Sequence, residues 1–75
     1  MSKLKKISGQ ECVKALSKMG FKPIRQRGSH VTMAKETVEG KIGTVVPMHP
    51  ELKIGTLKGV LRKAKIAEEE FMKNL

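Results

Sequence analysis

The sequence is poor in aromatic residues and has a single cysteine, and each shortage argues against a kind of site. It contains no Trp or Tyr and only two Phe, Phe21 and Phe71, which we expect in the core. A sheet that stacks nucleic-acid bases on aromatic rings is therefore not expected. Cys12 stands alone, so the chain can form neither an internal disulfide nor a zinc site built from cysteines. Cys12 and the five Met residues are expected to fill the core.

Acidic residues and long apolar runs are also scarce. Seven Asp and Glu face sixteen Lys and Arg, a formal charge of +9 that points to a polyanionic partner. The acids are scattered or grouped as Glu68–Glu70, so neither a metal site nor another cofactor is predicted. No apolar run approaches the roughly 20 residues of a membrane span, and no apolar segment follows the basic start, Met1–Ile7. We therefore expect no membrane association and a cytoplasmic location.

The length of 75 residues favours one domain covering residues 1–75, without internal repeats or linkers. A chain of this size buries only about 60–65% of the surface that its unfolded form exposes. A deep substrate cavity is therefore not expected. A functional site would lie on the surface or in a shallow groove.

Two segments have the pattern of amphipathic helices. Ser8 and Glu11 have the spacing of a capping box, and the apolar residues after them predict a helix over about residues 9–19 that ends at Gly20. After a connecting loop, Met48–Gly55, a second apolar face repeats along a helix over residues 57–64 with Thr56 as its N-cap.

A third, shorter helix is predicted at the C-terminus. The acidic run Glu68–Glu70 favours a helix start, because negative charge there interacts well with the helix dipole. Phe71, Met72 and Leu75 are predicted to pack inward from it.

Three strands are expected between the first two helices. Phe21–Gln26 reads as an edge strand or one that begins late, because Pro23 cannot donate to a ladder. Gly28 and Ser29 supply a turn into a half-buried strand, His30–Lys35, in which Val31 and Met33 alternate with Thr32 and Ala34. A hairpin turn at residues 38–41 with a positive φ at Gly40 leads to the third strand, which contains Ile42, Thr44 and Val46 and stops at Pro47.

The predicted order is α-β-β-β-α with an extra short C-terminal helix. Two helices on one face of a three-stranded antiparallel sheet form an α+β sandwich. Double-stranded-RNA-binding domains share this order, so the expected fold is double-stranded-RNA-binding-domain-like.

The tripeptide Gly28-Ser29-His30 is the strongest candidate for chemistry. It follows a basic stretch, residues 22–27, whose Arg25 and Arg27 could hold a phosphate together with the amides of the turn. An imidazole titrates near neutrality and can move protons. Since RNA supplies its own nucleophile, the 2′-hydroxyl, such a histidine could cleave a phosphodiester by acid–base catalysis without a metal. The alternative is that His30 is a half-exposed strand residue without a chemical role.

The second predicted helix offers a candidate RNA-binding surface. Lys58, Arg62 and Lys65 recur at i, i+4 and i+7 and form a basic ridge. Lys53 and the amides at Gly55 and Thr56 stand at the helix N-terminus, where a phosphate is electrostatically favoured. The alternative is an ordinary solvated helix face.

From Ser8 to Leu75 the chain resembles the HicA family of toxins, small ribonucleases of bacterial and archaeal toxin–antitoxin pairs. The pieces that carry the resemblance occur in the family's order and at ordinary spacings: SGQECVKAL (8–16), MGFK (19–22), RQRGSH (25–30), VVPMH (45–49), GTL (55–57), Ile66 and EEF (69–71). Within the fourth piece, residues 46–49 match the family's V-P-x-H motif, and the fifth piece, residues 55–57, matches its G-T-L motif. Pro50 and Glu51 after His49 depart from the small or polar residues of many relatives.

The resemblance implies a toxin of a type II toxin–antitoxin pair, a metal-independent endoribonuclease that cleaves mRNA. It implies that His30 is the catalytic residue, and it makes His49 a candidate second acid or base. It also implies RNA as substrate and a cognate HicB-type antitoxin, with DNA contacted only indirectly through that antitoxin. Two other functions stay open: a non-catalytic RNA-binding module of the same fold, and a structural half of a regulatory complex whose partner binds DNA.

Overall fold

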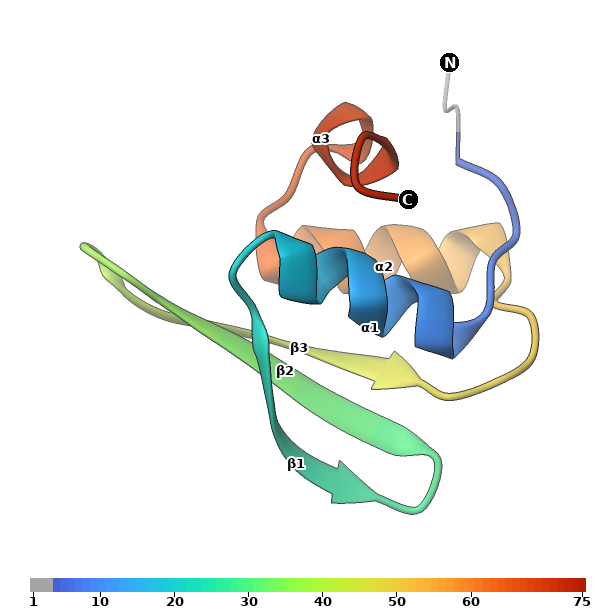
Figure 1. The fold of residues 1–75 in the computed structure, drawn as a ribbon, viewed down its shortest axis with the longest axis horizontal. Helices are drawn as coiled ribbons and strands as arrows, with labels where there is room; N and C mark the ends of the chain where they lie inside the picture. Colours follow the sequence, from blue (N-terminus) through green and yellow to red (C-terminus); the bar gives the residue numbers. More distant parts are fainter. Residues whose placement is uncertain (1–3) are drawn as a thin grey trace.

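The protein is an α+β sandwich in which the helices lie on one side of a three-stranded antiparallel sheet (Figure 1). The computed structural model describes residues 4–75. The expected domain, residues 1–75, and the basic start of the chain both include Met1–Lys3, which lie outside the described residues. The predicted order, which double-stranded-RNA-binding domains share, is confirmed. The elements are α1 (Gly9–Lys18), β1 (Lys22–Arg27), β2 (His30–Thr37), β3 (Gly40–Pro47), α2 (Ile54–Ala64) and α3 (Glu68–Met72).

The predicted capping box begins α1. The hydroxyl of Ser8 accepts from the Glu11 backbone N–H at 3.0 Å, and the Glu11 carboxylate accepts from the Ser8 backbone N–H at 3.0 Å. The helix ends at Lys18, one residue before the predicted end, and Gly20 follows with φ +99°. Both ends are therefore local features that the sequence encodes directly.

The sheet has the order β1-β2-β3, so β1 is an edge strand as predicted. Its register with β2 shifts between Pro23 and Arg25, which leaves Ile24 as an extra residue. A two-residue turn at Gly28 and Ser29 joins the strands, and φ of +55° at Gly28 suits a residue without a Cβ. The β2–β3 hairpin turns at residues 38 and 39, and β3 ends at Pro47 as predicted.

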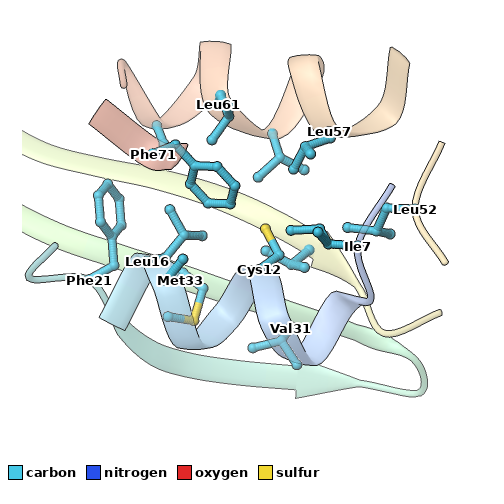
Figure 2. Packing of buried hydrophobic residues seen from close by; sticks show 14 residues of the cluster. Ile7, Cys12, Leu16, Phe21, Val31, Met33, Leu52, Leu57, Leu61 and Phe71 are labelled. Atoms are coloured by element: carbon cyan, nitrogen blue, oxygen red, sulfur yellow. The ribbon is translucent and has the colours of Figure 1, made fainter. Parts of the chain in front are cut away.

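The core lies between the sheet and the helices. Figure 2 shows side chains from every layer pointing into this interior, among them Leu16 of α1, Met33 of β2, Leu61 of α2 and Phe71 of α3. Phe21 and Phe71 are buried as predicted, and so is Cys12. The prediction was wrong for Leu75, which is 42% exposed because α3 stops at Met72.

Ala34 also differs from the predicted alternation. It is buried although it lies on the face of β2 opposite Met33. Its small side chain lines a hollow together with the longer side chains of Lys22 and Ile24.

The second helix begins earlier than predicted. Its N-cap is Lys53, which makes no side-chain capping bond, and Ile54 is the first helical residue. Thr56 is therefore not the N-cap but lies in the first turn. The predicted apolar face is confirmed, since Leu57, Val60, Leu61 and Ala64 are buried. The hydroxyl of Thr44 in β3 donates to the Val60 carbonyl at 2.8 Å and ties α2 to the sheet.

No helix within residues 4–75 is long and apolar enough to cross a lipid bilayer.

Candidate nucleic-acid interface

His30 lies on the face of the sheet that the helices leave uncovered. Side chains alternate between the two faces of a strand, and Val31 and Met33 are buried under the helices. His30 and Thr32 therefore belong to the opposite face, which we call the open face. His30 itself is solvent-exposed. An imidazole in this position is accessible to a large substrate.

Two strand neighbours flank His30. Arg27 of β1 is paired with it on one side and Pro47 of β3 on the other. Arg27 and His30 close the two-residue turn and form a hydrogen-bonded pair, in which Cα atoms lie about 5.5 Å apart. His30 and Pro47 form a non-hydrogen-bonded pair, a kind in which the Cα atoms lie about 4.5 Å apart. Because paired residues share a face, the guanidinium of Arg27 and the imidazole of His30 project from the same side.

Arg25 belongs to the same group. It is paired with Thr32, which places it diagonally across from His30, and diagonal neighbours lie about 7–8 Å apart. Both guanidinium groups are therefore within reach of a phosphate that contacts His30. The structure brings together the predicted residues Arg25, Arg27, Gly28, Ser29 and His30, which we call the His30 group.

The open face holds two further residues that the sequence reasoning missed. Lys22, paired with Ala34, continues the row of cations along β1, so every open-face residue of this strand outside the bulge is positively charged. Thr32 brings a half-exposed hydroxyl two residues from His30. The alternation of β2 was enough to find Thr32, since residues two apart share a face.

The turn before His30 is anchored to the end of β3. The Met48 backbone N–H donates to the Ser29 carbonyl at 2.5 Å, and the Gln26 side-chain amide donates to the Gly28 carbonyl at 3.1 Å. Both carbonyl groups of the turn therefore accept hydrogen bonds from other residues of the protein. The conformation of the turn is thus fixed by contacts from β1 and from the loop after β3.

His49 lies in that same loop. Its backbone carbonyl accepts from the Gly9 N–H at 2.9 Å, and it is two residues beyond Pro47, the strand partner of His30. Both histidines are exposed and belong to one corner of the molecule, where the β1–β2 turn, the loop after β3 and the N-terminus of α1 meet. The backbone therefore places His49 in the loop that follows the strand partner of His30.

The predicted cations of α2 form a separate surface in the helical layer. All of them are exposed: Lys53, Lys58, Arg62 and Lys65, together with Thr56. The N-terminus of α2 lies at the same end of the molecule as the β1–β2 turn, and its C-terminus lies at the other end (Figure 1). Because the α2 cations lie in the helical layer and His30 lies on the open face, the two sets of residues form separate patches.

The middle of this helix surface has mixed charge. Lys58 and Arg62 line a hollow of about 300 Å³ against the start of α3, where Glu68 also lies.

Two groups outside the open face are shifted from their ordinary ionisation. Burial raises the pKa of the Cys12 thiol to about 12, which keeps it protonated and unreactive. The pKa of the Glu11 carboxyl is lowered, chiefly by the hydrogen bond from the Ser8 backbone and next by the Ser8 side chain. Within residues 4–75, no three His, Cys, Asp or Glu side chains are grouped so that they could hold a metal ion.

A family model matches most of the chain. The model of the family described as HicA toxin of bacterial toxin-antitoxin matches residues 9–66 of the 75-residue chain. The matched region begins at the first residue of α1 and ends just after α2, so it includes the whole sheet and the loop with His49. No curated protein matches the chain.

Proposed function

The chain belongs to the HicA toxin family, and from this premise we propose that it is a metal-independent endoribonuclease that cleaves mRNA. Family membership itself makes it a toxin with a cognate antitoxin as partner. The proposal adds the reaction, the residues that perform it and a cytoplasmic site of action, where mRNA is translated. DNA would be contacted only indirectly, through a HicB-type antitoxin.

His30 would act as the acid–base catalyst. In this reaction the 2′-oxygen of the RNA attacks the adjacent phosphorus, and the 5′-oxygen of the next nucleotide leaves. One proton must be removed from the 2′-hydroxyl and one delivered to the leaving oxygen. A positioned histidine that carries out such a transfer contributes about 10²–10⁴-fold to the rate.

Arg25 and Arg27 would hold the phosphate that reacts. As charge develops on its oxygens, fixed cations and backbone amides stabilise the transition state more than the ground state. Gly28 and Ser29 offer amides next to His30, and Lys22 extends the cationic row for a neighbouring phosphate. Recognition would rest on phosphates and 2′-hydroxyls, which suits a face without aromatic rings.

The observation that carries the proposal is the pairing of His30 with Arg27 on the exposed, open face, with Arg25 at the diagonal position. A histidine with only a structural role needs neither that exposure nor two arginines on its own face. His49 is proposed as a secondary contributor that supplies the complementary proton transfer from the adjacent loop.

The test compares RNA cleavage by the parent and by His30→Ala in the presence of a metal chelator. We expect the parent to remain active and the variant to lose activity by on the order of 10²-fold or more, with RNA affinity and fold retained. An RNA with a 2′-deoxy nucleotide at the cleavage site should resist the parent. If His30→Ala cleaves as fast as the parent, or the parent does not cleave RNA, the non-catalytic RNA-binding module replaces the proposal.

A further inference from the structure

The two edges of the sheet differ in how they are protected. An unpaired strand edge can pair with another chain, and proteins usually block such edges with proline, bulges or charge. The β1 edge has all three: Pro23, the register shift that leaves Ile24 unpaired, and the row of cations. The opposite edge, formed by β3, is regular over its whole length, and its only proline is its last residue.

The regular pairing of β2 with β3 shows which backbone groups point outward. Thr37 and Gly40 close the two-residue hairpin turn as a hydrogen-bonded pair, and such pairs alternate with non-hydrogen-bonded ones along the ladder. Lys41, Gly43 and Val45 therefore direct their backbone N–H and C=O groups away from β2. We call these groups the β3 edge.

Within residues 4–75, the N–H groups of Lys41, Gly43 and Val45 make no backbone hydrogen bond to a loop or turn. All three residues are exposed, and exposure of Gly43 is exposure of its backbone. Only the Met33 carbonyl oxygen, at 3.7 Å, would lie near a Cβ placed on Gly43. The exposure of these three residues leaves the β3 edge open to solvent.

Two lysines flank the β3 edge, the first of them opposite Glu36 of β2. Lys41 is at the hairpin end of the strand, and Lys63 lies on the neighbouring side of α2. That side is identified by Val60, whose carbonyl accepts from Thr44 of β3, because Lys63 follows Val60 by three positions on the helix surface. Arg62, by contrast, faces the hollow beside α3.

We propose that the cognate antitoxin docks on the β3 edge by adding a β-strand, with acidic side chains placed to meet Lys41 and Lys63. This inference rests on the proposed function, which makes an antitoxin the physiological partner. Backbone groups in a row recognise an extended peptide, since main-chain hydrogen bonds provide affinity in such strand addition. A second copy is disfavoured because each copy carries +9. RNA lacks the alternating peptide groups that a strand edge pairs with.

The test uses a matched pair of substitutions at Gly43 and the purified cognate antitoxin. Gly43→Pro removes one outward N–H without removing a bond to β2, and Gly43→Ala keeps that N–H while adding a Cβ at ordinary van der Waals distance from the Met33 carbonyl oxygen. We expect Gly43→Pro to bind the antitoxin at least tenfold more weakly than the parent, and Gly43→Ala to bind like the parent. Equal binding by the parent and Gly43→Pro would overturn the proposal.

A second measurement does not depend on whether Gly43→Pro folds. Amide hydrogen exchange of the parent is followed with and without antitoxin, and we expect exchange at Gly43 and Val45 to slow at least tenfold in the complex. Unchanged amide exchange at Gly43 and Val45 would overturn the proposal. It would also be overturned if an RNA oligonucleotide, and not the antitoxin, slowed exchange at these residues. A dimer of the free parent that Gly43→Pro dissociates would overturn it as well. RNA cleavage by the same free variants reports separately on the proposed function, since Gly43 lies outside the His30 group.

Discussion

Gly9, the first residue of α1, packs directly against the carbonyl group of Pro47. A Cβ on Gly9 would overlap with the Pro47 carbonyl oxygen and lie 2.7 Å from the Met48 Cα. This close approach brings the N-terminus of α1 onto the end of β3, next to the strand pair that contains His30. The SGQE and VVPMH segments of the sequence are therefore parts of one corner.

Gly9→Ala should destabilise the protein. Neither neighbour is a flexible side chain, so the backbone must move, and overpacking of this kind costs about 1–3 kcal/mol. Gly59→Ala is the matched control, because a Cβ there meets nothing within 4 Å and alanine is the better helix former by about 0.5–1 kcal/mol. Chemical denaturation should rank Gly59→Ala above the parent and Gly9→Ala below it. Equal stability of the two variants would contradict the close approach.

The capping box should make stability depend on acidity. The pKa of the Glu11 carboxyl is lower in the folded protein than in the unfolded chain, so its ionised form stabilises the fold at neutral pH. This contribution is lost as the pH falls through the folded-state pKa of Glu11. Denaturation at neutral and at acidic pH should show a smaller change for Glu11→Gln than for the parent. The same change in both proteins would separate Glu11 from the acid response.

Cys12 should be protected from thiol reagents in the native state. Its side chain is buried, and burial raises the pKa of the thiol to about 12, so little thiolate is present at neutral pH. We expect alkylation to be slower by on the order of 100-fold or more in the native protein than in denaturant. Alkylation is monitored by mass spectrometry. Rapid alkylation of the native protein would show that the packing around α1 opens readily.

The basic ridge of α2 can be tested by the salt dependence of RNA binding. If Lys58 and Arg62 contact two phosphates, the double alanine variant should reduce the slope of log affinity against log salt by roughly 1.4 on single-stranded RNA. The matched control is the double alanine variant of Lys14 and Lys18, exposed on α1, which removes the same net charge. Equal slopes for the two variants would remove the ridge from the RNA-binding surface.

The start of α2 shows where sequence patterns fail. Thr56 is a good N-cap residue, whereas Lys53 has no side chain that can cap, so the pattern favoured the later start. In the structure the Leu57 N–H bonds to the Lys53 carbonyl, and half-buried Ile54 belongs to the first turn. Packing of the helix against the core decides its first residue, and this tertiary effect has no local signature.

The row of cations on β1 was only partly predictable. Alternation from Arg27 places Arg25 on the same face and would place Pro23 there next. The extra residue at Ile24 shifts the register, so Lys22 takes that position instead. A bulge is set by the pairing of two strands, and counting along one strand cannot reveal it. By contrast, the strands, the capping box and the turn before His30 are encoded locally and were predicted.

The hydrogen bonds that anchor the turn before His30 bear on how soon the free protein can act on RNA. The Ser29 carbonyl is bonded to Met48, the Gly9 N–H is bonded to His49, and these bonds tie the turn, the loop after β3 and α1 together. The corner is thus complete within the free toxin, and its geometry requires nothing from a partner. On the proposed function, the toxin would therefore cleave RNA without a lag once it separates from its antitoxin.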